Sequence, residues 1–172
     1  MRREEIIVDT NALLIPGKFG IDIFEELERL GYRHVIVPKM VVNELKKLRE
    51  REGEGESEDE GEGKGGGPKL TGKEKMAANV GYSLLQKYVD ITISEQEHRS
   101  GYNRLRCTVT IEEGEKKGEK GEWMTDELII ALAAERKAAV LTNDRELRTK
   151  LSESGIVTVY LRGRNRLDET FS

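Results

Sequence analysis

Apolar residues follow two spacings along the 172-residue chain. Short runs rich in Ile, Val and Leu predict strands, whereas apolar positions three and four residues apart predict amphipathic helices. The two types alternate, which is typical of βαβ units, so we expect an α/β fold with helices on both faces of a mostly parallel sheet. The expected strands are residues 5–8, 34–37, 89–93, 138–141 and 156–161, and the expected helices are residues 21–30, 39–51, 73–88, 125–137 and 144–154.

Two segments interrupt this alternation. Residues 52–67 read "EGEGESEDEGEGKGGG" and contain no apolar side chain, so they predict a disordered, acidic and Gly-rich loop inserted into the fold. Residues 95–122 predict an inserted loop or hairpin, because "RLRCTVTIEE" (104–113) alternates like an edge strand outside the main rhythm. Neither segment divides the chain, and we expect one domain over residues 1–172.

The formal net charge of −4 comes from this acidic loop. Without residues 52–67, 28 of the 29 basic residues and 26 of the 33 acidic residues remain, so the rest of the chain carries +2. The single Cys107 excludes an internal disulfide, and no Cys and His spacing predicts a zinc site. No apolar run is long enough to cross a membrane, so we expect a cytoplasmic protein. The abundance of Lys, Glu and Arg is typical of proteins from hot environments.

Four acidic residues stand where solvation of a surface charge is not the obvious explanation. Asp9 directly follows the first strand and Asp144 the fourth, so both lie at the carboxyl edge of the sheet, where parallel α/β folds bind ligands. Asp126 begins an apolar helix, where plain N-terminal capping is the alternative. Glu44 lies on the shoulder of an apolar helical stripe, where a side chain that reaches solvent is the alternative.

Together, these four acids indicate a divalent cation. No Lys, Arg or His stands beside them at the strand ends, and like charges that converge in a cleft repel one another strongly. A divalent ion would remove this conflict. Carboxylate oxygens favour Mg²⁺ or Mn²⁺, as one or two ions, over zinc. Such an ion at the edge of an α/β sheet suits phosphodiester chemistry.

The sequence around these acids resembles the PIN-domain nucleases. The matching words are "VDTNALL", "VVNEL", "TDELIIALA" and "LTNDREL", and they follow one another in the family's order over nearly the whole chain. The stretches "DTNALLIPGKFGIDIFEEL" and "GEKGEWMTDELI" resemble the archaeal branch near the PIN proteins of ribosomal RNA processing, and more distantly the VapC-type toxins. The resemblance implies a three-layer α/β/α sandwich. The acidic loop and residues 95–122 depart from the minimal pattern of the family.

The resemblance also implies a Mg²⁺- or Mn²⁺-dependent endoribonuclease that leaves a 5′-phosphate and a 3′-hydroxyl. Asp9, Asp126 and Asp144 would bind the metal, and Glu44 would bind a second ion or position the attacking water. Neighbouring polar side chains can hydrogen-bond these carboxylates, although turn chemistry is the alternative for the two asparagines. These neighbours are Thr10, Asn11, Thr142 and Asn143.

Two basic segments are candidates for contact with RNA phosphates, and a tyrosine among them is a candidate for base stacking. The first is "HRSGYNRLR" (98–106), and the second is "YLRGRNRLDE" (160–169), for which solvated charge near the terminus is the alternative. Candidate partners are RNA, a second copy of the chain, and a ribosome-assembly or antitoxin protein. Two other functions stay open, a PIN-fold assembly protein with little catalysis and a toxin. The candidate RNA-binding residues are Arg99, Tyr102, Arg104, Arg106, Arg162, Arg164 and Arg166.

Overall fold

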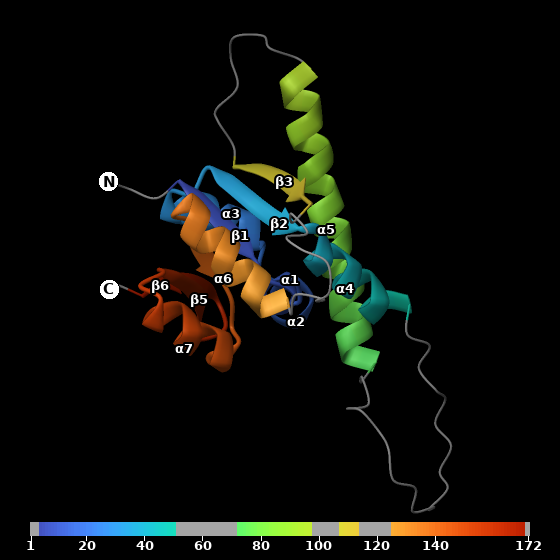
Figure 1. Ribbon diagram of the computed structural model, residues 1–172. Helices are drawn as coiled ribbons and strands as arrows, with labels where there is room; N and C mark the ends of the chain where they lie inside the picture. Colours follow the sequence, from blue (N-terminus) through green and yellow to red (C-terminus); the bar gives the residue numbers. More distant parts are fainter. Residues whose placement is uncertain (1–3, 51–71, 98–106, 114–124, 171–172) are drawn as a thin grey trace, which may run out of the picture.

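The computed structural model of the protein describes residues 4–50, 72–97, 107–113 and 125–170, without the side chains of residues 95–97. A six-stranded sheet in the order β3-β2-β1-β4-β5-β6 forms its centre (Figure 1). All neighbours pair in parallel except β5 and β6, which are antiparallel. The strands are β1 (Glu5–Val8), β2 (His34–Pro38), β3 (Thr108–Glu112), β4 (Ala139–Leu141), β5 (Thr158–Arg162) and β6 (Arg166–Glu169).

Helices cover both faces of this sheet, which confirms the expected three-layer α/β/α arrangement. In Figure 1, α6 passes in front of the strands, whereas α3 lies behind them. The layer behind is tied together by the rings of Phe24 in α3 and Tyr88 in α5, whose centroids lie 4.6 Å apart. The helices are α1 (Thr10–Leu13), α2 (Ile15–Phe19), α3 (Ile23–Leu30), α4 (Lys39–Glu50), α5 (Gly72–Glu97), α6 (Thr125–Arg136) and α7 (Arg145–Glu153).

The central strand β1 fixes the geometry of the carboxyl edge. Ile6, Ile7 and Val8 are fully buried, because β2 and β4 pair with β1 on its two sides and helices cover both of its faces. A parallel strand buried in this way is apolar at every position, as the run "IIV" predicts. The chain therefore leaves β1 at Asp9 from the rigid middle of the sheet.

Most of the predicted elements are present, but one predicted strand is wrong. Residues 89–93 lie inside helix α5, which continues well beyond residue 88. The helix is kept here by Thr92, whose hydroxyl donates to the Tyr88 carbonyl (2.9 Å) and accepts the Val109 N–H of β3 (2.9 Å). Helix α5 thereby covers the outer edge of the sheet, and β3 takes the place beside β2 that residues 89–93 would have needed.

The expected edge strand within residues 104–113 is present as β3, but it pairs in parallel with β2 and forms no hairpin in the part of the chain described here. The short helices α1 and α2 and the last strand β6 were not predicted. The acidic loop at residues 52–67 and most of the insertion at 95–122 lie outside the described residues. Within the described ranges, no helix is both long enough and apolar enough to span a bilayer.

Helix α5 approaches α1 and α2 unusually closely, and two glycines permit this. A Cβ atom on Gly81 would lie 1.9 Å from the Leu13 carbonyl oxygen, and one on Gly17 would lie 2.3 Å from the Ala77 Cα. Both positions therefore exclude any side chain. Because α1 begins directly after Asp9, this crossing fixes the turn that presents Asp9 and Thr10.

Candidate active site

Asp9 lies at the carboxyl end of β1 and is 5% exposed. It is the N-cap of α1, and its Oδ1 accepts the Ala12 N–H at 2.7 Å. Its Oδ2 accepts a short hydrogen bond from the Thr142 hydroxyl, which follows β4. Asp9 is thus held by groups from two adjacent parallel strands, at the edge predicted for ligand binding.

The environment of Asp9 favours its neutral form. Burial raises the pKa of this carboxyl from 3.8 to about 7, although the bonds from Thr142 and Ala12 lower it. The negative charges of Asp144 and Asp126 raise it further. These two acids therefore lie near enough to act on Asp9, as the sequence predicted. Glu44 is absent from the groups that shift this pKa.

Asp144 follows β4 and begins α7. Its Oδ1 accepts the N–H groups of Glu146 (2.8 Å) and Leu147 (3.3 Å), so it is an N-cap. Its own N–H donates to the Thr142 hydroxyl oxygen at 3.1 Å. Since that hydroxyl donates to the Asp9 carboxylate, Thr142 connects this carboxylate to the backbone of Asp144.

Asp126 lies in the first turn of α6, and its side chain is 34% exposed. Lys150 of α7 approaches its Oδ2 at 3.4 Å. Sequence reasoning missed this lysine, because only the packing of α6 on α7 brings the two together. An ion pair this exposed contributes little stability, so Lys150 is a mobile partial counter-charge for Asp126.

Glu44 lies on α4 and is exposed, in keeping with the alternative that it reaches solvent. The Thr10 hydroxyl donates to its Oε2 at 2.6 Å. This bond connects Glu44 to the residue that directly follows Asp9. Glu44 is therefore attached to the rim of the same edge of the sheet, outside the buried position of Asp9.

Thr10 and Thr142 bind carboxylates as predicted, but the two asparagines do not. Asn11 is exposed, and its side chain forms no hydrogen bond to an acid among the described residues. Asn143 accepts the Leu161 N–H at 2.8 Å. Asn143 therefore joins the loop after β4 to β5, a long-range contact that is neither a bond to a carboxylate nor a bond within its own turn.

No three Asp, Glu, His or Cys side chains of the described residues form a group that could hold a metal ion as they stand. The carboxylates nevertheless keep acceptor capacity. The helix caps use only Oδ1 of Asp144, Lys150 meets only Oδ2 of Asp126, and Thr10 meets only one oxygen of Glu44. Each Asp9 oxygen accepts a single bond and keeps a second lone pair. Hard oxygen donors with this much excess negative charge fit Mg²⁺ or Mn²⁺.

The candidate RNA-binding residues that the structure describes differ in whether an acid already pairs with them. Arg162 forms an ion pair with Asp168 at 2.7 Å, which raises the pKa of Arg162 and lowers that of Asp168. Arg164 and Arg166 are exposed in and after the β5–β6 turn. The candidates of the first basic segment lie outside the described residues: Arg99, Tyr102, Arg104 and Arg106.

Comparison with known proteins shows that this chain is similar in sequence to one protein family and to one ribonuclease. The family described as "PIN like domain" matches residues 6–61 and 103–164, more than half of the chain. Ribonuclease VapC9 of Archaeoglobus fulgidus is 24% identical over 161 residues, which cover 94% of this chain and 85% of that protein.

Two solved structures share the fold. The PIN domain endonuclease Utp24 superposes with a TM-score of 0.58 at 16% identity, over 96% of this chain and 90% of the other. A domain of a functionally unknown protein from Methanocaldococcus jannaschii superposes with a TM-score of 0.53 at 19% identity, over 98% and 99% of the two chains.

Proposed function

Since the chain belongs to the PIN-like domain family, we propose that it is a divalent-metal-dependent endoribonuclease that hydrolyses RNA phosphodiester bonds. The similarity to Ribonuclease VapC9 over most of both chains supports RNA as the substrate class. The sequence resemblance to the ribosomal RNA-processing branch favours processing of ribosomal or other structured RNA as the biological role. The products would carry a 5′-phosphate and a 3′-hydroxyl.

The convergence of acids at one sheet edge is the observation that carries this proposal. Asp9 and Asp144 end adjacent parallel strands and share the Thr142 hydroxyl. Asp126 acts on Asp9 from α6. No Lys, Arg or His of the described residues pairs with Asp9 or Asp144, so their combined negative charge supports a cation-binding role.

Asp9, Asp126 and Asp144 are the proposed metal-binding residues. These residues differ in how firmly they are held and in which oxygens stay free for a ligand. Asp9 is rigid, because β1, Ala12 and Thr142 hold it, whereas Asp144 keeps Oδ2 for a ligand while Oδ1 caps α7. A bound Mg²⁺ or Mn²⁺ would polarise the phosphate and supply hydroxide near neutral pH. Glu44, held by Thr10 at the rim, would accept a proton from the attacking water or bind a second ion.

The decisive experiment replaces Asp144 by asparagine and measures cleavage of structured and single-stranded RNA with Mn²⁺, with Mg²⁺ and with a chelator. Asparagine is as good an N-cap as aspartate, so α7 should stay intact. Asp22→Asn is the matched control, because Asp22 caps α3 through the N–H groups of Phe24 and Glu25 away from the acid cluster.

We expect Asp144→Asn to lose at least about a hundredfold in cleavage rate, as is usual when a group that stabilises the transition state is removed, and Asp22→Asn to keep the wild-type rate. The chelator should stop wild-type cleavage. Cleavage that survives both the Asp144 substitution and chelation would refute the metal-dependent mechanism. Wild-type protein that binds RNA but does not cut it would support the assembly-protein alternative.

A toxin of a toxin–antitoxin pair is the second candidate function, and the similarity to Ribonuclease VapC9 favours it. The two roles differ in their effect on cells. A toxin should arrest growth within one induction and should be rescued by a small co-expressed partner. Cells that grow normally during expression of active enzyme would exclude the toxin role.

A further inference from the structure

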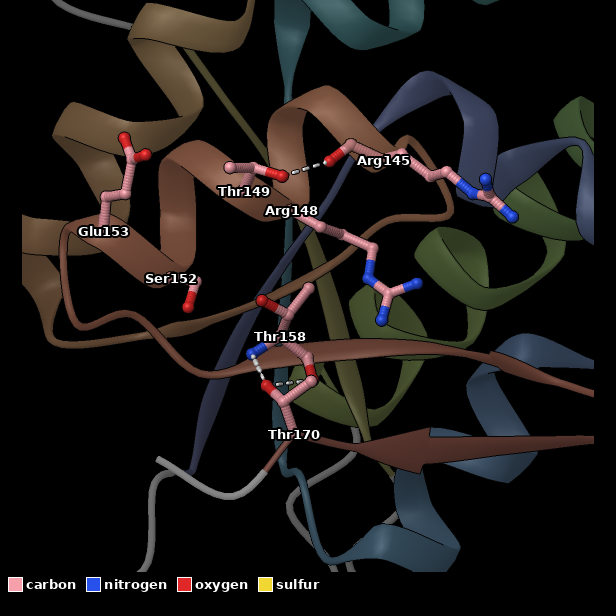
Figure 2. Close-up of a pocket in the computed structure, with 7 residues that line it drawn as sticks. All are labelled: Arg145, Arg148, Thr149, Ser152, Glu153, Thr158 and Thr170. Atoms are coloured by element: carbon pink, nitrogen blue, oxygen red, sulfur yellow. Dashed lines mark hydrogen bonds between the residues drawn. The ribbon is translucent and has the colours of Figure 1, made fainter.

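A cavity of about 490 Å³ lies between α7 and β5, outside the acid cluster. Its volume falls in the range of ligand sites, about 300 to 1,000 Å³. One face of α7 and the start of β5 form its walls (Figure 2). The lining residues are Arg145, Arg148, Thr149, Ser152, Glu153, Thr158 and Thr170.

Two arginines at one end of this cavity lack acidic partners. Neither Arg145 nor Arg148 forms an ion pair with any described residue, in contrast to Arg162, which binds Asp168. They are three positions apart and so share one face of α7. The Arg148 guanidinium carbon lies 4.2 Å from the ring centre of Tyr160, and this cation–π contact restrains the side chain. Two unpaired guanidinium groups, one of them already ordered, are typical of phosphate recognition.

The rest of the cavity is lined by hydroxyl groups and one acid. Thr149 donates to the Arg145 carbonyl (3.0 Å), and the Thr170 hydroxyl is bound to the backbone of Thr158. Ser152 is exposed, so its hydroxyl can bind a polar ligand, whereas Thr158 is only 2% exposed. Glu153 would repel a phosphate at its own end of the cavity, so we expect a phosphate to bind at the end with the two arginines.

One end of the cavity lies at the beginning of α7, where Asp144 stands. Arg145 is the residue after Asp144, and both lie at the beginning of α7. The opposite face of this helix carries Lys150, which meets Asp126. A single rigid helix therefore places an acid of the cluster at its tip and two free guanidinium groups along its outer face.

We propose that this cavity binds the sugar–phosphate backbone of single-stranded RNA next to the bond that is cut. Arg145 and Arg148 bind consecutive phosphates, and the hydroxyl of Ser152 meets the neighbouring ribose. This assignment rests on the proposed endoribonuclease function and adds a substrate-positioning site to it. It makes the RNA strand run along α7, away from Asp144.

The test compares the double variant Arg145→Ala/Arg148→Ala with wild-type protein in binding and in cleavage. Binding of a labelled single-stranded 12-mer is followed by fluorescence anisotropy in chelator, at several salt concentrations. Cleavage is measured with Mn²⁺ over a range of RNA concentrations. Arg33→Ala/Lys137→Gly is the control, because it removes the same charge from exposed positions at the opposite edge of the sheet, and Lys137, with a φ of 55°, tolerates glycine.

We expect the Arg145→Ala/Arg148→Ala variant to lose about tenfold or more in affinity and to raise KM similarly, since charged hydrogen bonds to phosphate are lost. Two lost phosphate contacts should flatten the salt slope by about 1.4, given about 0.7 per contact for single strands. Arg145→Ala alone should flatten the salt slope by about half as much, about 0.7, because one phosphate contact is lost. It guards against misfolding, since Arg145 has no packing partner comparable to Tyr160.

Two outcomes would overturn the inference, and they are distinguishable. If wild type cleaves RNA but the double variant matches the control in affinity, KM and salt slope, the cavity is not an RNA site and the endoribonuclease proposal stands. If wild type neither binds nor cleaves RNA, the proposed function fails and this inference fails with it.

Discussion

Replacement of Asp9 by asparagine should make the metal-free protein more stable at neutral pH while it abolishes cleavage. Asp9 is 5% exposed, and its pKa is raised to about 7, chiefly by burial. An asparagine keeps the shape and can still accept the Ala12 N–H, but it carries no charge. The substitution therefore removes the cost of a buried carboxylate and also removes a proposed metal ligand.

The magnitude follows from the two pKa values. One pKa unit corresponds to about 1.4 kcal/mol, so a rise from 3.8 to about 7 means that ionised Asp9 costs the fold on the order of 4 kcal/mol. The unfolded chain releases this proton near pH 4, whereas the folded protein holds it up to about pH 7. The folded state thus binds more protons within this window, and the free energy of unfolding falls as the pH rises from about 4 to about 7. Above pH 7 both states are ionised and the loss is complete.

The assay is urea denaturation followed by circular dichroism, in chelator, at several pH values between 4.5 and 8. The stability of Asp9→Asn relative to wild type should rise with pH and gain about 3 kcal/mol across the series, because about 1 kcal/mol of the total is already lost at pH 4.5. Asp90→Asn removes an exposed carboxylate from α5 and should show no such trend. A stability difference that is the same at pH 4.5 and pH 8 would refute the reasoning, because it would mean that Asp9 titrates alike in both states.

Two further changes test the fold and the RNA surface. Gly81→Ala should cost about 1 to 3 kcal/mol or more in thermal denaturation, because its methyl group would meet the Leu13 carbonyl oxygen at 1.9 Å. Gly72→Ala, with open space around it on the same helix, should cost nothing, and equal melting temperatures for the two variants would contradict the close crossing. Alanine at all three arginines of the β5–β6 hairpin should weaken RNA binding and flatten its salt dependence by about 1.4, the value for two contacts, since one of the three is already paired with Asp168. An unchanged salt slope for this triple variant, Arg162→Ala/Arg164→Ala/Arg166→Ala, would show that the hairpin does not contact RNA.

The sequence predicted the fold well where burial dictates composition. The central strands β1 and β4 are apolar at nearly every position because both faces of the sheet are covered there, and this pattern needs no partner to be recognised. The error at residues 89–93 has the opposite cause. Ile91 and Ile93 favour a strand locally, but Thr92 connects the helix to β3, which lies far away in the chain before folding.

The positions of Asp9 and Asp144 at the ends of strands could be read from the sequence, because the carboxyl ends of parallel strands share one edge. The contacts between them could not. Thr142 connects the two acids, Lys150 meets Asp126, and Asn143 binds β5 only because helices and strands pack in one particular way. The sequence suggested carboxylate contacts for all four neighbouring polar residues, and packing decided that only the two threonines make them.

By itself, then, the sequence determined the α/β class, the family and the acids that follow the strands, because these depend on local composition and order. Only the tertiary structure decided that the pKa of Asp9 is raised, since desolvation depends on what surrounds a group. It alone also placed the unpaired Arg145 and Arg148 beside a cavity next to Asp144. In the sequence "NDRELRTK" these arginines look like ordinary surface charges, and only the packing of β5 against α7 shows that no acid of the described residues pairs with them.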